Sequence, residues 1–417
     1  MTDPRDRGPS LDRRAFLRGA GAAAAAGLAG CVNAPAADPS ARFDHPAADA
    51  SATATFRGDL RNRGFRPGAT VPASVEAAWT LPDVNVGEHT APKAGAVRDP
   101  AGNYLLPGDD GAVRSVTVDG EVNWLSRTEA ADRGIHGTPT VANGHAYVGA
   151  YDGALYAFDL DTGRRVWRNR LGDAIGASPT YHEGTLYTAV EYGDPTGSGF
   201  GVDAVTGREV WRDDRPTDHP HSTPAIDTDA GHFVFGANDG RCYGWSFPTM
   251  ERRFAFETGG PIKGPVTIHD GGAFFGSWDS FVYRVDLADG TEDWSVETGD
   301  LVMGGIAADP DRDVVYAGGH DGILRALDAA TGEAVWTYDA GGWLIGSVTT
   351  TGDTVLVGSN GGRLHAVRAD DGERRWTYDP PGGDVSSDPY VDADGVVVSA
   401  RATDDESGHA VRLVAAE

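Results

Sequence analysis

One short pattern recurs eight times along the chain, at intervals of 40 to 45 residues. The copy at Tyr156–Arg168 reads YAFDLDTGRRVWR, in which two runs of apolar residues flank an acidic turn with glycine. A repeat of this length that is built from strands is typical of a β-propeller, where each repeat forms one blade. Helical repeats of similar length are excluded, since no apolar pattern with a period of 3.6 residues is sustained. Each copy closes on an aromatic residue: Trp79, Trp124, Trp167, Trp211, Phe254, Trp294, Trp336 and Trp376.

Turn residues divide each repeat into four short strands. Asp-Gly pairs such as Asp152-Gly153 supply the positive φ that a tight hairpin between the second and third strands needs. Thr-Gly pairs such as Thr162-Gly163 connect the third strand to the fourth, and Asp159 can bond the amides of that turn. We expect each closing tryptophan to fill the wedge between adjacent blades, with its indole N–H bonded to a neighbouring carbonyl.

The two ends of the chain are expected to complete one blade together. The last repeat, 384–417, holds three strands, and the early strand Ser74–Leu81 has no blade of its own. If this strand joins the last repeat, the ring closes without exposed edges. The sequence therefore predicts an all-β fold, an eight-bladed propeller of four-stranded antiparallel blades that is closed by an N-terminal strand.

The charge of the chain restricts its partners. The formal net charge is −27, with 47 Asp, 15 Glu and only two lysines, Lys93 and Lys263. This excess of aspartate resembles proteins of extreme halophiles, because high salt screens the repulsion between like charges. Nucleic acid is excluded as a partner, since phosphate binding requires a basic face. Of the two cysteines, Cys242 lies in a strand pattern and is interpreted as a small core residue.

The N-terminus carries targeting signals. Arg13-Arg14 precedes a short apolar run and resembles a twin-arginine export signal, and the Leu28–Cys31 stretch resembles a lipobox. We therefore expect a signal peptide over residues 1–30 and a lipid on Cys31, which anchors the protein to the outer face of the cell membrane. Residues 31–55 are rich in Ala, Asp, Pro and Ser and are predicted to form a disordered tether, followed by the propeller at 56–417.

The repeat itself carries a family resemblance. The pattern A-x-D-x-x-T-G-x-x-x-W, at Ala157–Trp167 and Ala326–Trp336, resembles the tryptophan-docking motif of the pyrroloquinoline-quinone (PQQ) repeat family. The segment Phe56–Phe65 is similar to the one that opens many secreted propellers of this kind, so the resemblance covers residues 56–417. It implies a quinoprotein-dehydrogenase-like fold. A lipid-anchored eight-bladed chain is similar to the lipoprotein of the outer-membrane β-barrel assembly machinery, which is a non-catalytic scaffold.

The same resemblance raises the question of a cofactor. Quinoprotein dehydrogenases of this family hold PQQ and calcium on the propeller axis, with a vicinal disulfide against the quinone. This chain has no Cys-Cys pair and no C-x-x-C-H segment. We therefore expect no cofactor, and PQQ with calcium remains the alternative.

Loop residues that precede the first strand of each repeat are expected to meet at one mouth of the propeller. The candidates are Lys93, His136, His221, Lys263, Met303, Trp343 and Asp384. His219, His221 and His136 could be metal ligands, or rim histidines bonded to water and backbone, and the second interpretation is favoured. Asp309–Asp313 and Asp392–Gly395 are interpreted as acidic turns rather than calcium loops, since neither continues to a bidentate glutamate.

These features predict a non-catalytic function. No catalytic motif is present, so we expect a monomeric, extracytoplasmic propeller whose rims bind protein partners. The alternatives are an oxidoreductase with PQQ on the axis and a binder of small molecules or polysaccharides at the axial mouth. Function is expected where the copies of the repeat differ, at the mouth, in the long hairpin 191–201 and around Phe254.

Overall fold

The computed structural model describes residues 49, 51–86, 94–130, 133–393, 395–402 and 407–417. They all belong to one compact unit, Asp38–Glu417. The targeting residues Arg13, Arg14 and Cys31 and the mouth candidate Lys93 lie outside the described residues. Within the described part of the chain, no helix is long and apolar enough to cross a membrane.

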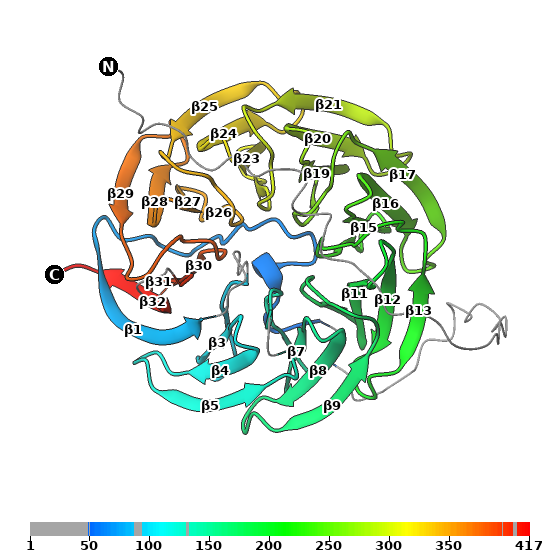
Figure 1. Cartoon of the computed structure of the whole chain (residues 1–417). Helices are drawn as coiled ribbons and strands as arrows, with labels where there is room; N and C mark the ends of the chain where they lie inside the picture. The colour runs from blue at the N-terminus through cyan, green and yellow to red at the C-terminus, as the bar shows by residue number, and fades with distance from the viewer. Residues whose placement is uncertain (1–48, 50, 87–93, 131–132, 394, 403–406) are drawn as a thin grey trace, which may run out of the picture. The chain divides into compact units, whose positions relative to one another are not determined.

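The described residues form eight antiparallel sheets of four strands each, arranged as blades around a central axis (Figure 1). Within a blade the first strand lies nearest the axis and the fourth lies at the circumference. Blade 1 contains β2 (Val97–Arg98), β3 (Tyr104–Pro107), β4 (Ala112–Val116) and β5 (Val122–Arg127), and blade 2 contains β6 (Thr140–Ala142), β7 (His145–Gly149), β8 (Ala154–Asp159) and β9 (Arg165–Arg170). Blade 3 contains β10 (Thr180–His182), β11 (Thr185–Glu191), β12 (Gly197–Asp203) and β13 (Glu209–Asp213), and blade 4 contains β14 (Ala225–Asp227), β15 (His232–Gly236), β16 (Arg241–Ser246) and β17 (Arg252–Glu257).

Blades 5 to 8 repeat the same arrangement. Blade 5 contains β18 (Thr267–His269), β19 (Gly272–Gly276), β20 (Phe281–Asp286) and β21 (Glu292–Glu297), and blade 6 contains β22 (Ala307–Asp309), β23 (Val314–Gly318), β24 (Ile323–Asp328) and β25 (Ala334–Asp339). Blade 7 contains β26 (Thr349–Thr350), β27 (Thr354–Ser359), β28 (Arg363–Arg368) and β29 (Arg374–Tyr378), and blade 8 contains β30 (Tyr390–Asp392), β31 (Gly395–Ala400), β32 (Gly408–Ala415) and β1 (Val75–Asn85).

The ring closes as the sequence predicts. Strand β1 pairs with β32, and the order β1-β32-β31-β30 makes blade 8 from both ends of the chain. The pairing runs from Val75 opposite Ala415 to Asn85 opposite Gly408, so the closing strand is longer than the expected Ser74–Leu81. The eight-bladed fold and its closure by an N-terminal strand are confirmed.

The closing tryptophans join neighbouring blades through their indole nitrogens. Trp336 Nε1 donates to the carbonyl of Ala369 in the next blade at 2.8 Å, and Trp376 Nε1 reaches the Pro72 carbonyl at 2.8 Å. The same bond recurs at Trp79, Trp124, Trp167 and Trp294, at 2.9 to 3.1 Å. The indole–carbonyl bonds that the sequence predicts are present at these six positions.

The turn glycines have a second role that the sequence did not reveal. Gly332 has a φ of +73° and lies against the ring of Trp294, so that an added Cβ would be 2.8 Å from the indole. Gly372 lies against Trp336 in the same manner. These glycines, in turns between the third and fourth strands, therefore provide both the left-handed conformation and the space for the tryptophan of the preceding blade.

A pair of glycine substitutions separates these two roles. Gly341 has nearly the same φ, +72°, but an added Cβ there would meet nothing within 4 Å. We expect Gly341→Ala to lower the free energy of unfolding by about 1 kcal/mol, through backbone strain alone. Gly332→Ala adds the clash with Trp294, so we expect a loss of about 2 to 3 kcal/mol. Urea unfolding of both variants measures the difference, and equal losses would contradict a packing role for Gly332.

Blade 4 departs from this pattern. Its aromatic closing residue is Phe254, and its own core contains Trp245, which is fully buried. Trp211 of blade 3 meets the Trp245 ring edge to face at 5.7 Å, and the Trp245 indole N–H donates to Asp213 at 2.8 Å. Cys242 is also fully buried here, and burial raises the pKa of its thiol, so its interpretation as a core residue is confirmed.

Residues 51–66, which we call the strap, pass from blade to blade around the axis, along the inner edges of the blades (Figure 1). Carbonyls of Leu60, Arg61, Arg63 and Gly64 accept the amides of Ile226, Ile268, Ala308 and Thr350, each at 2.7 or 2.8 Å. The strap begins earlier than the predicted boundary at residue 56, because Ser51 pairs with β10 and Ala54 with β6. Residues 51–55, expected to be part of a disordered tether, are therefore part of the propeller. The strap also includes the short 3-10 helix η1 (Phe56–Gly58).

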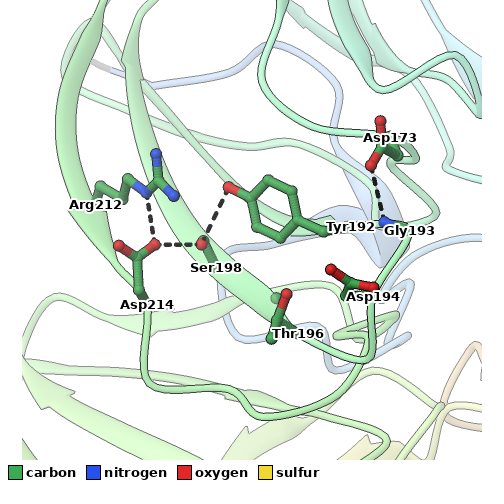
Figure 2. Close-up of a pocket in the computed structure, with 9 residues that line it drawn as sticks. Asp173, Tyr192, Gly193, Asp194, Thr196, Ser198, Arg212 and Asp214 are labelled. Carbon is green, nitrogen blue, oxygen red and sulfur yellow. Dashed lines mark hydrogen bonds and ion pairs between the residues drawn. The ribbon is translucent and has the colours of Figure 1, made fainter. Parts of the chain in front are cut away.

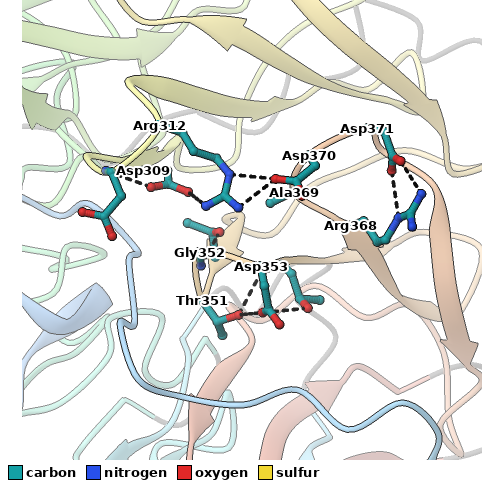
Figure 3. A network of polar contacts seen from close by, with 12 residues as sticks. Asp309, Arg312, Thr351, Gly352, Asp353, Arg368, Ala369, Asp370 and Asp371 are labelled. Carbon is teal, nitrogen blue, oxygen red and sulfur yellow. Dashed lines mark hydrogen bonds and ion pairs between the residues drawn. The ribbon is translucent and has the colours of Figure 1, made fainter.

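The acidic stretch at the end of β22 is a strand-linking turn (Figure 3). The buried carboxylate of Asp309 accepts the amide of Asp311 at 3.0 Å and forms an ion pair with Arg312 at 3.2 Å. Arg312 also reaches Asp370 of the next blade at 2.8 Å. The Asp309 carboxylate is thus occupied by the turn and by an inter-blade ion pair, as its interpretation as an acidic turn predicts.

Candidate functional site

The inter-blade linkers and the turns between second and third strands lie at the same end of the blades, because successive strands are antiparallel. We call this face the mouth. A regular pair of backbone bonds builds it: the Ile262 amide donates to Ala237 in blade 4 at 3.0 Å, and the Trp278 amide of blade 5 donates to the Pro261 carbonyl at 2.9 Å. Each linker is therefore fixed to a turn of the blade before it and a turn of the blade after it. The same bonds recur from blade to blade around the axis.

Below the mouth, a belt of hydrogen bonds passes from blade to blade around the axis. In each bond, a backbone amide at the start of one blade donates to a side-chain oxygen at the same position of the next. The bonds are Gly95 to Thr138, Thr138 to Ser178, Ser178 to Thr223, Gly305 to Ser347 and Ser347 to Asp388, at 2.8 to 3.1 Å. The small hydroxyl residues that precede the first strands are thus explained by the close approach of the linkers.

The strap lies on the side of the belt that faces away from the mouth. Arg57 is 5% exposed, and its guanidinium donates to the carbonyls of Asn62 and Ile306, both at 2.8 Å. Burial lowers the pKa of this guanidinium to about 10, with Asp388 acting in the opposite direction. The cavity between Arg57, Arg66 and Asp388 has a volume of about 10 Å³, which is the space of one water molecule.

The structure places four predicted candidates at equivalent linker positions. His136, His221 and Met303 each lie two residues before a belt position, at the mouth, and Lys263 lies at the same distance before Pro265 in the equivalent linker. Trp343 and Asp384 each lie two residues before the position that is equivalent to His136 in their own linkers. There the Trp343 carbonyl accepts the Asn360 amide and Asp384 forms an ion pair with Arg401, at 2.8 and 2.7 Å. Burial raises the pKa of the Asp384 carboxyl.

Two of the candidate histidines are brought together by a tyrosine. The His136 ring lies 4.2 Å from the Tyr151 ring, and the Tyr151 hydroxyl is 3.4 Å from His221 Nδ1. The same His221 nitrogen is 3.4 Å from the carboxylate of Glu191. Burial, and then Glu191, raise the pKa of the Tyr151 hydroxyl well above its usual value, so this group stays neutral. The cluster is polar and partly buried, and it can donate and accept hydrogen bonds at the mouth.

His219 has a local structural role. Its Nε2 lies 2.8 Å from the Tyr192 carbonyl and 3.3 Å from the Asp194 carbonyl, in the hairpin turn of blade 3. This contact confirms the interpretation of His219 as a rim histidine bonded to backbone. Among the residues that the structure describes, no group of three or more His, Cys, Asp or Glu side chains could hold a metal ion.

The long hairpin of blade 3 borders an open groove of about 630 Å³ (Figure 2). Tyr192 points its hydroxyl at Ser198, 3.2 Å away, and Ser198 and Arg212 both bond Asp214 at 2.5 Å. On the other side, the Gly193 amide donates to Asp173 at 2.8 Å. Through Ser198 and Gly193, these contacts tie the hairpin to Asp214, which follows β13, and to Asp173 in the preceding linker.

Two indole rings at the mouth were missed or only partly interpreted from the sequence. Trp278, in the β19–β20 turn, is 37% exposed and carries the Lys263 ammonium over its ring at 4.1 Å. Trp343 is 47% exposed and stacks on His320 at 5.2 Å with an interplanar angle of 10°. Tyr151, Trp278 and His320 each directly precede the aspartate of a turn between second and third strands. That position is the signal in the sequence that could have identified them.

The cavity beside Arg57, at the level of the belt, is too small for a bound quinone. A flat cofactor with several rings needs a site of a few hundred Å³, whereas the cavity beside Arg57 holds about 10 Å³. The Arg57 side chain lines this cavity and donates to the backbone carbonyls of Asn62 and Ile306.

Comparison with known proteins assigns the repeat to a family. The family model described as outer membrane protein assembly factor BamB matches residues 109–246, 201–342 and 320–416. A 1-butanol dehydrogenase (cytochrome c) of Thauera butanivorans is 28% identical over 232 residues, which are 52% of this chain and 25% of that protein. BamB of Nitrosomonas eutropha is 30% identical over 176 residues, 41% of each chain. The chain thus spans a quarter of the dehydrogenase and less than half of the assembly factor.

Solved structures agree on the fold. The quinohemoprotein alcohol dehydrogenase of Comamonas testosteroni superimposes with a TM-score of 0.70 at 16% identity, over 86% of this chain and 80% of that one. Similarity at this level of identity concerns the architecture of the propeller. What the axis and the mouth hold must be argued from the residues of this chain.

Proposed function

Because the chain belongs to the family described as outer membrane protein assembly factor BamB, we propose that it is a non-catalytic binding and scaffold protein that acts outside the cytoplasm. The observation that carries this proposal is the strap. It buries Arg57 at the inner edges of the blades, and the cavity beside this side chain measures about 10 Å³, which is too small for a cofactor of several rings. The side chains that vary between blades then remain at the mouth, where they face partners.

An oxidoreductase is the second candidate, and the similarity to 1-butanol dehydrogenase favours it. Acid extraction of the protein isolated from its native cells, followed by mass spectrometry, separates the two functions. For a scaffold we expect no stoichiometric quinone, and we expect crosslinking in intact cells to recover a protein partner. A stoichiometric quinone, together with calcium-dependent dye reduction, would overturn the proposal.

We also propose that a lipid on Cys31 anchors the protein to the outer face of the membrane after export through Arg13-Arg14. The two patterns occur in the order that export and lipidation require, and this order supports the proposal. Cell fractionation tests it. Cys31→Ser should release the protein from the membrane fraction, and retention of this variant in that fraction would count against the anchor.

A further inference from the structure

We propose that one arc of the mouth docks a protein partner through a segment that presents an apolar side chain next to a carboxylate. The arc consists of Lys263, Trp278, Leu301, His320 and Trp343, on blades 5 to 7, and we call it the aromatic arc. This inference rests on the proposed scaffold function and names the surface and the partner chemistry.

The backbone makes the aromatic arc continuous. The Val302 amide donates to Ser277, next to Trp278, at 3.0 Å, and the His320 amide donates to the Leu301 carbonyl at 2.9 Å. The Leu344 amide, next to Trp343, donates to Gly319 at 3.1 Å. The parts of the arc are thus fixed to one another before any partner binds. Such preorganisation lowers the cost of ordering side chains on association.

Exposed tryptophans occur on the aromatic arc. Among the described residues, the large apolar side chains with the highest exposure include two tryptophans, Trp278 and Trp343. The others are valines and a leucine, such as Val166 on β9 and Val335 on β25, which lie on outer strands. Scattered single aliphatic residues need no explanation, but exposed tryptophans that border the same arc have the composition of interface hot spots.

The charge of the aromatic arc selects an acidic segment. Lys263 is the one lysine among the described residues, and its ammonium lies 4.1 Å from the centroid of the Trp278 ring. The chain as a whole carries a net charge of −27, so most of its surface repels a carboxylate. Burial lowers the pKa of Lys263, while Glu191 and Asp218 act in the opposite direction. A partner carboxylate would be attracted to this ammonium while its apolar neighbour covers the indole face.

Three blocked octapeptides test the proposal with the folded full-length chain. The first contains two Phe-Asp pairs, the second has Lys in place of each Asp, and the third has Ala in place of each Phe. The protein is labelled with 5-fluorotryptophan, and Trp278→Phe and Trp343→Phe assign the two arc signals in the fluorine NMR spectrum. We expect the Phe-Asp peptide to shift these two signals, with a dissociation constant at least tenfold lower than that of either control peptide.

Variants link the binding to the aromatic arc. Trp343→Ala and Lys263→Gln should each weaken binding of the Phe-Asp peptide at least fivefold. Val335→Ala, which changes an apolar residue that is 54% exposed on the outer strand β25, should leave the affinity unchanged. Equal shifts with all three peptides, no shift with any, or tighter binding of a neutral oligosaccharide would each overturn the proposal. If crosslinking in cells recovers the same partner with Trp343→Ala, the scaffold function stands and this surface is wrong.

Discussion

Replacing Trp336 with alanine is expected to lower the free energy of unfolding by about 4 kcal/mol, whereas Trp343→Ala lowers it by less than about 1 kcal/mol. Trp336 is 9% exposed and packs on Tyr316 with ring centroids 5.6 Å apart, between blades 6 and 7. Its loss leaves a cavity against Gly372 and an unpaired Ala369 carbonyl. Trp343 is 47% exposed and loses mainly its stacking on His320.

The comparison uses the same chemical change at two tryptophans of one chain. Urea unfolding followed by far-ultraviolet circular dichroism, at one fixed salt concentration, gives the two midpoints. The salt must be fixed because the repulsion in a chain of charge −27 depends on ionic strength. Trp343→Ala should also weaken peptide binding at the aromatic arc while Trp336→Ala should not, provided it is folded. Similar stability losses in both variants would refute the division between docking tryptophans and mouth tryptophans.

The blades and their closure could be predicted from the sequence because each depends on local chemistry that repeats. Asp159 fixes its turn by accepting the Thr162 amide at 2.9 Å, and Gly163 takes a φ of +70°. A pattern of this kind is visible wherever a turn demands a particular residue. The closing strand β1 was identified by a count of strands, since an unpaired strand at each end of the chain would leave an open edge.

The strap could not be predicted, because it has no periodic pattern. It bonds the blades through its backbone, as Arg61 and Arg63 do with Ile268 and Ala308. Several of its buried side chains are polar: Asn62 is 1% exposed and donates to backbone carbonyls of two blades, among them Val266 at 3.1 Å. Residues 51–55 of the strap carry no large apolar side chain and have the composition of a tether, and only the surrounding ring of blades makes them ordered.

The mouth was predicted in part for a related reason. The linker positions of His136 and Lys263 could be found because small residues and proline mark the start of each first strand. The turn residues Trp278 and His320 were missed, since the bonds that bring turn and linker together join different blades. The sequence shows which residues occur at equivalent positions. It does not show which of those positions face one another across the axis.

Acidification is the second change that we expect to lower the free energy of unfolding strongly, and it acts through His365 in β28. This histidine is 2% exposed, and its ring nitrogens lie 3.0 Å from the hydroxyls of Tyr338 and Ser359. Burial, followed by the positive charges of Arg363 and Arg374, lowers its pKa to about 4, with Asp379 acting in the opposite direction. The imidazole is therefore neutral in the folded protein at neutral pH.

The sign of the effect follows from the direction of this shift. In the unfolded chain a histidine titrates near pH 6.5, so between about pH 6.5 and 4 the unfolded state binds a proton that the folded state does not. The contribution of His365 is fully present above pH 6.5 and is lost as the pH falls towards 4. The shift corresponds to a loss of up to about 3 kcal/mol over this window.

A neutral replacement measures this contribution. His365→Gln retains a polar side chain that can bond Tyr338 or Ser359 and does not titrate, so its free energy of unfolding should fall less between pH 6.5 and 4. The other acid-sensitive groups are the same in both proteins and cancel in the difference between the two pH profiles. We expect the profiles, normalised at pH 7.5, to separate by about 2 to 3 kcal/mol at pH 4, because one buried imidazole no longer competes for a proton. Parallel profiles would show that His365 takes up its proton without leaving the folded blade.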